Sequence, residues 1–462
     1  MNHRSTARGF ARGFDGGSAL FTDLYELTMA QSYFRERMSA PATFSLFTRN
    51  LPANRGYLVT AGLESVLQYL EMLRFSGDDI DYLRSTAIFA DDFLEYLKEF
   101  RFTGEVWAMP EGRLQFADEP VLEVTAPIAE AQLVETFIIN QMNLQTIVAT
   151  KAARCVWAAR SRAVVDFSLR RTHGRDAGMK VARCSYIAGC VSTSNVLAGK
   201  VYGIPIAGTM AHSYVSSFPE EIDSFRAYAR SFPDGTTLLI DTYDTVAGAR
   251  NATVVATEME IRGHRLRSVR LDSGDLLTLS REVRQVLNGA GLDYVDIFAS
   301  GGLDEYQVLE LLDAGAPING FGVGTRMGVS DDAPWLDLAY KLVKYDGRPV
   351  LKLSTGKVSL VDEKQVYRLS DARGMILGDV IALRAEAPPP EGEALLTRVM
   401  EGGRITAPLP SLEEVRSRFR EEFDRLPERY KALRETPDYP VDLSSRLDAL
   451  QKRTEQQVLE RL

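Results

Sequence analysis

The sequence of 462 residues predicts an α/β protein whose central part forms a parallel sheet covered on both faces. Two observations lead to this fold class. Between about residues 136 and 346, short apolar runs alternate with amphipathic helical segments, as strands and crossover helices do in repeated βαβ units. Outside that region, strands and helices mix without regular alternation, which is typical of an α+β domain. The alternation fits either a barrel or an open doubly wound sheet.

The chain is expected to begin with a disordered tail, residues 1–17, rich in Gly, Arg and Ser. Residues 18–135 are expected to form an N-terminal α+β domain. Its first helix is predicted near Asp23, because Asp23 and Glu26 have the spacing of a capping box. Strands are predicted at 44–49, 104–109 and 121–125, and the first should be half-buried because apolar and polar residues alternate in it.

The central region, residues 136–346, is expected to form the α/β domain. Two of its helical segments end near Gly289 and Gly315, which have the positions of C-cap glycines. Polar and Gly-rich turns follow several apolar runs and should meet at the carboxyl edge of the sheet, where α/β proteins bind ligands. Candidate parallel strands lie at 163–168, 205–210, 237–241, 268–272, 294–300 and 318–323.

The C-terminal segment, residues 347–462, is expected to form strands and then helices. A charge run at 413–429 is interpreted as the solvated face of an amphipathic helix. Antiparallel strands are predicted at 348–354, 357–361 and 365–369.

Composition excludes several classes of protein. Hydrophobic residues make up 45% and charged residues 25%, values typical of globular domains. The net charge of −9 argues against nonspecific nucleic-acid binding, and no apolar run reaches the ~18 residues of a membrane helix. The three cysteines, Cys155, Cys184 and Cys190, lack metal-ligand spacing with the histidines, so we expect reduced thiols in a cytoplasmic protein.

One of only four histidines, His212, follows an apolar, strand-like entry in the stretch 206–213. Gly208, Ala211 and Ser213 are small and would let a phosphate approach the imidazole, which is a competent nucleophile or general base near pH 7. A lone histidine at a strand end is more often structural. The other motifs at the same predicted edge of the sheet favour a catalytic role for His212.

Two Gly-rich turns, 300–302 and 322–325, follow predicted strands and fit phosphate-binding loops, which suggests a ligand with two phosphorylated ends. Arg270 would neutralise a diphosphate leaving group, while Asp272 and Asp275 would accept ribose hydroxyls or hold Mg²⁺ through water. The alternative is that one acid caps the next helix and the other pairs with an arginine.

Phe167 is followed by Arg170 and Arg171 at another predicted strand end. This combination suits an aromatic carboxylic acid, whose ring would lie on Phe167 and whose carboxylate would lie near an arginine. A structural salt bridge is an equal alternative for either single arginine.

Six motifs in this order resemble the nicotinate phosphoribosyltransferase family over nearly the whole chain. The resemblance implies a type II phosphoribosyltransferase: an irregular (β/α) barrel with an α+β domain built from the N-terminal region and the C-terminal segment. It also implies a homodimer with active sites shared across the interface. The motifs are TDLYELTM at 22–29, DFSLRR at 166–171, STSNVLAG at 192–199, GTMAHS at 208–213, LDSGD at 271–275 and GFGVGT at 320–325.

The implied reaction joins nicotinate to 5-phosphoribosyl-1-diphosphate and yields nicotinate mononucleotide and diphosphate, with Mg²⁺ and coupled ATP hydrolysis, in NAD biosynthesis. His212 would be phosphorylated by ATP. Phe167 and Tyr25 would sandwich the pyridine ring, with Tyr25 coming from the partner subunit, and Arg170 would lie beside the nicotinate. Arg270 and Asp272 would engage the diphosphate and ribose, and the expected phosphate or ribose contacts are Asp275, Ser300, Gly301, Gly302, Gly322, Gly324 and Thr325.

Two positions bear on the pyridine. Ser194 stands where nicotinamide-using relatives tend to carry aspartate, so serine favours the acid. Ser168 stands where the family usually has glycine, and its added side chain could shift Phe167. The alternatives are a nicotinamide or quinolinate phosphoribosyltransferase, a noncatalytic nucleotide-binding regulator, or a structural oligomer with an incidental phosphate pocket.

Overall fold

The computed structural model describes residues 19–353 and 359–460, so the predicted tail and parts of the strands predicted at 348–354 and 357–361 lie outside the described residues. The chain forms two compact units. One unit contains the chain up to Ile147 together with the chain from Trp335 onward, and the other is Val148–Pro334. The described part of the chain contains no helix with the length and apolar character needed to cross a bilayer.

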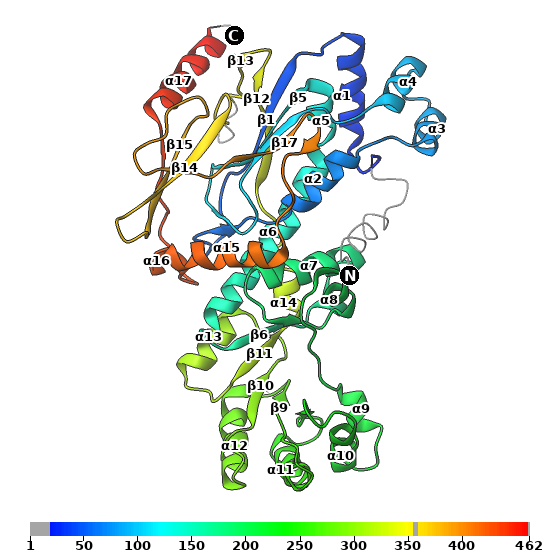
Figure 1. The fold of residues 1–462 in the computed structure, drawn as a ribbon, viewed down its shortest axis with the longest axis vertical. Coiled ribbons are helices and arrows are strands. Elements are labelled where there is room, and N and C mark those ends of the chain that lie inside the picture. The colour runs from blue at the N-terminus through cyan, green and yellow to red at the C-terminus, as the bar shows by residue number, and fades with distance from the viewer. Residues whose placement is uncertain (1–18, 354–358, 461–462) are drawn as a thin grey trace. The chain divides into compact units, whose positions relative to one another are not determined.

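The discontinuous unit is organised around a seven-stranded sheet in which all neighbouring strands pair antiparallel (Figure 1). Its strand order is β13-β12-β1-β5-β3-β17-β18, so both ends of the chain contribute to one sheet. The strands are β1 Pro41–Thr48, β3 Glu105–Ala108, β5 Pro120–Pro127, β12 Leu338–Tyr345, β13 Arg348–Pro349, β17 Thr397–Glu401 and β18 Arg404–Ile405.

Helices cover this sheet because their apolar residues recur at helical spacing. In α4, Phe93, Leu94 and Leu97 share one face and are all buried in the core that also holds Leu46 and Val124 of the sheet. The helices of the first part are α1 Leu24–Arg35, α2 Leu63–Met72, α3 Gly77–Ser85, α4 Asp91–Glu99 and α5 Ile128–Leu133, and α6 Glu135–Ala158 crosses the boundary between the units.

The C-terminal segment adds a four-stranded sheet in the order β16-β14-β15-β19 and three helices. A two-stranded sheet joins β2 Leu58–Val59 to β4 Leu114–Gln115. The C-terminal elements are β14 Lys364–Ser370, β15 Ile376–Leu383, β16 Glu393–Ala394, β19 Val441–Leu443, α15 Leu412–Arg425, α16 Glu428–Lys431 and α17 Ser445–Leu459.

Three local predictions in this unit are wrong. The capping box at α1 does not form: Asp23 makes no side-chain cap, and Glu26 turns instead to the backbone N–H of Thr136, 2.9 Å away. Strand β1 is buried on both faces, whereas alternation predicted one exposed face. Phe44 and Leu46 lie in the core with residues of the helices, and Ser45 bonds to Glu123, which pairs with Lys364 of β14. The described residues at 359–361 form no strand.

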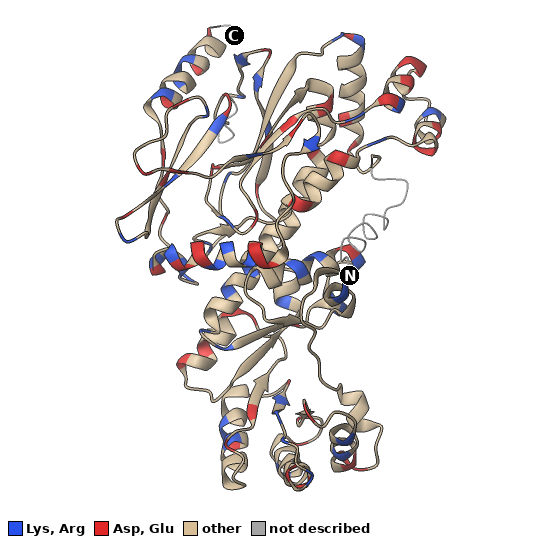
Figure 2. Cartoon of the chain, in the orientation of Figure 1, with Lys and Arg blue, Asp and Glu red and all other residues tan. Residues whose placement is uncertain are grey.

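The charge run is only partly solvated. The ribbon of α15 carries both blue basic and red acidic residues (Figure 2), but Glu422 of that helix is buried. Arg368 of β14 donates to Glu422 and binds Asp379 of β15 with two hydrogen bonds of 3.0 and 2.6 Å. Burial and the Asp379 carboxylate raise the pKa of neighbouring Glu119 well above its ordinary value. Arg368 is therefore the cation shared by Asp379 and Glu422, and Arg113 also binds Glu422, at 2.7 Å.

The continuous unit contains a curled six-stranded parallel sheet in the order β7-β6-β11-β10-β9-β8 (Figure 1). Strand β6, the first in this unit, pairs with β11, the last, as strands do when a sheet curls toward closure. The strands are β6 Ala163–Asp166, β7 Ser192–Thr193, β8 Thr237–Leu239, β9 Ser268–Leu271, β10 Asp296–Ala299 and β11 Gly320–Val323.

Helical crossovers separate the strands, as the alternation of the sequence predicts. Gly315 follows α13 with a φ of +71°, as predicted for a C-terminal glycine, but Gly289 is still helical and Gly291, at +73°, follows α12 instead. The helices are η4 Leu169–Arg171, α7 Arg175–Ile187, α8 Val196–Tyr202, α9 His212–Ser216, α10 Glu221–Ser231, α11 Thr245–Ile261, α12 Leu276–Gly289, α13 Glu305–Asp313 and α14 Thr325–Gly328.

One predicted strand is absent and one short strand was not predicted. The segment 205–210 makes only a single parallel bridge, between Ile206 and Thr193 of β7. Gly and Pro residues in this segment disfavour a continuous β-ladder. Among the described residues, no strand pairing joins the segment around Ile206 to β8, so the sheet is not closed there. Strand β7 has only two residues, too few for a periodic signal.

Candidate functional site

The predicted chemical residues of the continuous unit gather at the carboxyl ends of its parallel strands. Arg270, at the end of β9, is the centre of this cluster. Its Nε donates to Ser300 Oγ at 2.8 Å, one Nη donates to Thr209 Oγ1 at 2.9 Å, and the other donates to Asp272 Oδ1 at 2.5 Å. The guanidinium also lies over the ring of Phe167, 5.4 Å from its centroid. One side chain thus joins four separate loops.

Asp272 lies two residues beyond Arg270 and also accepts a 2.5 Å hydrogen bond from Ser300. Partial burial by itself would raise the pKa of Asp272, but the Ser300 hydrogen bond and the charge of Arg270 outweigh burial and lower it. Asp272 is therefore ionised near neutral pH and can accept hydrogen bonds from hydroxyl groups of a ligand.

Asp241, after β8, holds the loop that carries Asp272. Its Oδ2 accepts hydrogen bonds from the Asp272 backbone N–H at 2.8 Å and from Ser273 Oγ at 2.6 Å. Its Oδ1 is buried and has no hydrogen-bond partner among the described residues. A buried carboxylate oxygen in this state is available to a water molecule or a hydrated cation.

His212 is the first residue of α9, and its side chain is 44% exposed. The Nδ1 atom lies 3.1 Å from Thr242 Oγ1, and Nε2 lies 3.8 Å from Asp272 Oδ2. The Thr242 hydroxyl thereby sets the orientation of the ring, which presents the histidine to the cluster around Arg270.

Phe167 follows β6, where its backbone N–H bonds to Val323 O of β11 at 2.8 Å. Its ring lies 5.8 Å from that of Phe298 and is only partly buried. Arg270 contacts the same ring. An aromatic side chain held from two sides and open on another can support a flat ligand.

Buried Asp166 organises the residues around Phe167. Its Oδ1 accepts from both the N–H and the hydroxyl of Ser168, at 2.9 and 2.5 Å, and its Oδ2 accepts from Thr193 at 2.7 Å. The backbone oxygen of Asp166 accepts from Ser194 N–H at 2.8 Å. The hydroxyl of Ser168 therefore points toward Asp166, and Ser194 is fixed beside the turn that carries Phe167.

The two Gly-rich segments differ from the predicted pair of loops. Gly301 has a φ of +98°, and a Cβ there would lie 1.8 Å from the Asp272 carbonyl oxygen, so only glycine fits. Gly302 is also left-handed, at +69°. Gly322 is buried inside β11 rather than in a loop, whereas Gly324 and Thr325 lie at the start of α14.

Three predicted residues stay outside this cluster. Arg170 is exposed on η4. Asp275 is the N-cap of α12, where its side chain accepts from Leu277 and Thr278 backbone N–H groups. One acid thus caps a helix while Asp272 pairs with Arg270, which is the alternative that the sequence left open. Tyr25 belongs to the other unit and bonds to Glu135 there.

Sequence reasoning did not single out Thr209, Thr242 or Gly328 as functional residues. Thr209 lies in the quoted stretch around His212, and Thr242 lies in the polar turn after β8, so their positions at the carboxyl edge were the available signal. Gly328 carried no signal, because its importance depends on its contact with Ser168.

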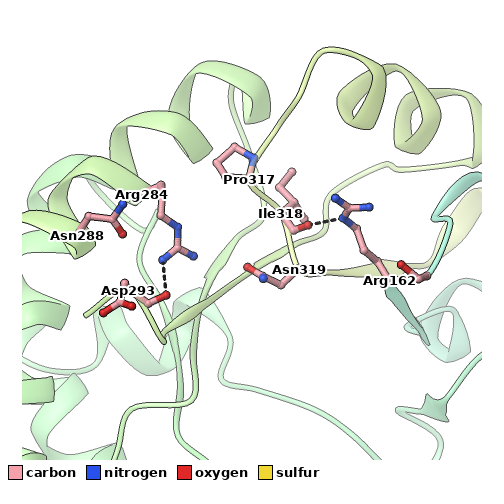
Figure 3. A pocket seen from close by; sticks show the side chains of 8 residues that line it. Arg162, Arg284, Asn288, Asp293, Pro317, Ile318 and Asn319 are labelled. Atoms are coloured by element: carbon pink, nitrogen blue, oxygen red, sulfur yellow. Dashed lines mark hydrogen bonds between the residues drawn. The ribbon is translucent and has the colours of Figure 1, made fainter. Parts of the chain in front are cut away.

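A pocket at the opposite, amino end of the parallel sheet is lined by none of the residues predicted for the functional site (Figure 3). Arg162 donates to Ile318 O at 2.8 Å, and Arg284 donates to Val295 O at 2.8 Å and to Asp293 O at 3.3 Å. These arginines satisfy carbonyl groups of loops that enter β10 and β11. Polar side chains at the amino end of such a sheet contribute to stability.

A curled parallel sheet with an Arg, Asp, His and Phe cluster at its carboxyl edge defines an α/β protein with a ligand site at that edge. The family descriptions for the N-terminal domain, the main family region and the C-terminal domain of nicotinate phosphoribosyltransferase match residues 20–143, 162–357 and 389–451. The chain belongs to the nicotinate phosphoribosyltransferase family.

Individual relatives agree with this assignment. A nicotinate phosphoribosyltransferase of Mycobacterium tuberculosis is 50% identical over 431 residues, which cover 93% of this chain and 92% of the relative. The crystal structure of human nicotinic acid phosphoribosyltransferase matches with a TM-score of 0.84 at 31% identity, covering 94% and 99% of the two chains. A structure described as nicotinate-nucleotide pyrophosphorylase from Pyrococcus furiosus matches with a TM-score of 0.73 at 26% identity, covering 92% and 97%.

Proposed function

We propose that this chain is a nicotinate phosphoribosyltransferase. It joins nicotinate to 5-phosphoribosyl-1-diphosphate and releases nicotinate mononucleotide and diphosphate, an entry to NAD by salvage. The observation that carries the proposal is the position of Arg270, which contacts Phe167, Ser300 and Asp272 together. A cation between an aromatic surface and an ionised carboxylate suits a reaction that joins a pyridine to a ribose carrying diphosphate.

Each residue of the site would have a separate role in the reaction. Phe167 would support the pyridine ring, and Arg170 and Ser194 would face its carboxylate. Asp272 would accept ribose hydroxyl hydrogens, while Ser300 and the glycines after β10 would hold phosphate. Arg270 would stabilise the negative charge on the departing diphosphate as the bond to the anomeric carbon breaks. The pyridine nitrogen then attacks that oxocarbenium-like carbon.

ATP hydrolysis is proposed to be coupled through His212. A ring nitrogen would take the γ-phosphoryl group of ATP and release ADP, and water would later remove that group as phosphate. The partial exposure of the ring and the hydrogen bond to Thr242 support this role, because an accessible and oriented imidazole is a competent nucleophile.

Mg²⁺ is the proposed cofactor and would supply positive charge to the phosphate groups. The described residues contain no cluster of three metal-ligating side chains, so we expect the ion to be held through water rather than by direct protein ligands. The residues fit a hydrated ion, because Asp241 offers a buried oxygen without a partner among the described residues.

The curled sheet is proposed to be an irregular (β/α) barrel, supported by the pairing of β6 with β11. The working form is proposed to be a homodimer in which Tyr25 of the partner subunit covers the pyridine. The exposure of Tyr25, 45%, supports this, since the ring is accessible to another subunit. The three cysteines are buried and form no disulfide among the described residues, which supports a reducing, cytoplasmic location.

The proposal is tested by following ADP, nicotinate mononucleotide and diphosphate with Mg²⁺-ATP and phosphoribosyl diphosphate, with and without nicotinate. We expect nicotinate to stimulate ADP release, and His212→Ala to abolish that release. His264→Ala is the matched control, because His264 pairs with Asp234 in the same unit but takes no part in the site. It should leave the formation of all three products unchanged.

Other outcomes separate the alternatives. If mononucleotide forms equally well without ATP, the transferase activity is supported and the phosphohistidine role of His212 is contradicted. Faster turnover of nicotinamide or quinolinate than of nicotinate would identify that pyridine as the substrate instead. No product from any of the three pyridines would favour a noncatalytic nucleotide-binding regulator.

Ser194→Asp is expected to reduce the preference for nicotinate over nicotinamide by about 10-fold or more, because a carboxylate there repels the acid and accepts from an amide N–H. The measurement is the ratio of kcat/KM for the two pyridines. Ser194→Asn is the control, since it adds similar volume without charge. An unchanged ratio in Ser194→Asp would show that Ser194 does not set the choice.

A further inference from the structure

Three glycines on β11 and α14 lie directly against the Phe167–Ser168 turn. A Cβ on Gly322 would lie 2.6 and 2.7 Å from two ring carbons of Phe167. A Cβ on Gly324 would lie 3.1 Å from the Phe167 carbonyl oxygen, and one on Gly328 would lie 2.4 Å from Ser168 Cβ. Side chains are therefore absent where the turn occupies the space.

Gly322 and Gly328 are not needed for a left-handed backbone, because neither has a positive φ. Glycine at 322 and 328 is explained by the close approach of Phe167 and Ser168. Gly322 is also buried within β11, away from a loop that could wrap a phosphate.

The contact between Ser168 and Gly328 has a particular consequence for the ring. Ser168 is buried, and its hydroxyl is committed to Asp166 at 2.5 Å. Its Cβ consequently faces Gly328, whose missing side chain provides the space. Ser168 and Gly328 are a complementary pair: the serine side chain fits because residue 328 has none.

We propose that Gly322 and Gly328 are positioning residues for the pyridine, and that Ser168 and Gly328 form a matched pair that sets where the ring of Phe167 lies. This inference rests on the proposed function, because it takes nicotinate as the ligand of Phe167. A methyl group at residue 328 pushes Ser168 away from Asp166, and the adjacent Phe167 moves with it. The platform for the pyridine then shifts relative to Arg270, whereas the Gly301–Gly302 turn is untouched.

A double-mutant cycle tests the pair: the parent chain, Gly328→Ala, Ser168→Gly and the double variant. Gly328→Ala is expected to raise KM for nicotinate about 10-fold and to leave KM for phosphoribosyl diphosphate within about twofold, since misplacing a substrate by about 1 Å has large effects. In the Ser168→Gly background the same change is expected to alter KM for nicotinate by less than about twofold, because the opposing Cβ is gone.

Ser168→Ala separates the methylene from the hydroxyl, because it keeps the Cβ that opposes residue 328. In that background Gly328→Ala is expected to remain harmful by about 10-fold. Nicotinate dissociation constants from equilibrium dialysis provide a readout that does not depend on turnover. Gly289→Ala is the matched control, because Gly289 lies in α12 with no atom within 4 Å of an added Cβ.

Equal effects of Gly328→Ala in the parent chain and in the Ser168→Gly background would overturn the matched pair. If Gly328→Ala does not fold, Gly322→Ala provides the second test, and an unchanged nicotinate affinity there would overturn the positioning role. A parent chain that makes no nicotinate mononucleotide would instead remove the proposed function. An active parent without coupling between residues 168 and 328 would remove this inference alone.

Discussion

Arg270→Met is expected to lower kcat/KM by about 10³-fold, and Arg270→Lys by about 10²-fold, because the site loses a cation with fixed geometry. The guanidinium makes hydrogen bonds to Ser300, Thr209 and Asp272 while it lies over Phe167. A lysine keeps the charge, but a single ammonium group cannot reach these groups in one planar arrangement.

The measurement is initial-rate formation of nicotinate mononucleotide, with each substrate varied in turn. Arg270→Lys should affect kcat more than KM for nicotinate, since charge on the departing diphosphate develops in the transition state. Arg267→Met is the matched control, because Arg267 is exposed immediately before β9, at the end away from the site. A loss confined to KM would assign Arg270 to ground-state binding and contradict the proposed mechanism.

Arg368→Met is expected to destabilise the discontinuous unit by about 3–5 kcal/mol, because it leaves the buried carboxylate of Asp379 without its cation, whereas Glu422 keeps Arg113. Arg368 is fully buried and binds both oxygens of Asp379 as well as Glu422. Methionine fills part of the volume but cannot neutralise the charge of Asp379. Tyr439, which donates to Asp379 at 2.9 Å, cannot replace a positive charge.

Urea unfolding followed by circular dichroism measures this effect as a lower midpoint with an unchanged slope. Arg398→Met is the matched control in the same unit, because Arg398 pairs with Glu401 at 2.7 Å on the surface. Its expected cost is below about 0.5 kcal/mol. Equal midpoints for the two variants would show that the buried network contributes no more than a surface pair.

The strands of the parallel sheet were predictable because each is a short, nearly continuous apolar run. Strands β8, β9, β10 and β11 lie within the predicted segments. The segment 205–210 has the same apolar character yet forms only one bridge. Whether an apolar run completes a ladder depends on the neighbouring strand, which local periodicity does not describe.

For the site, too, some features could be predicted from the sequence and others could not. Position after a strand predicted that Arg270, Asp272 and Ser300 would lie at one edge, and the structure joins them by hydrogen bonds. Motif spacing did not show that Asp275 caps α12. A short polar side chain just before a helix competes between capping and ligand binding, and only the backbone geometry decides between them.

The family, the alternation of strands and helices and the residue types at the carboxyl edge could all be predicted from the sequence, because they depend on local order along the chain. Which side chains come into contact became known from the three-dimensional fold alone. The partners of Arg270 come from several separate loops. Ser168 contacts Gly328, although the two residues are far apart in the sequence. Such contacts depend on how strands pair and how closely backbones approach, and no periodic pattern records either distance.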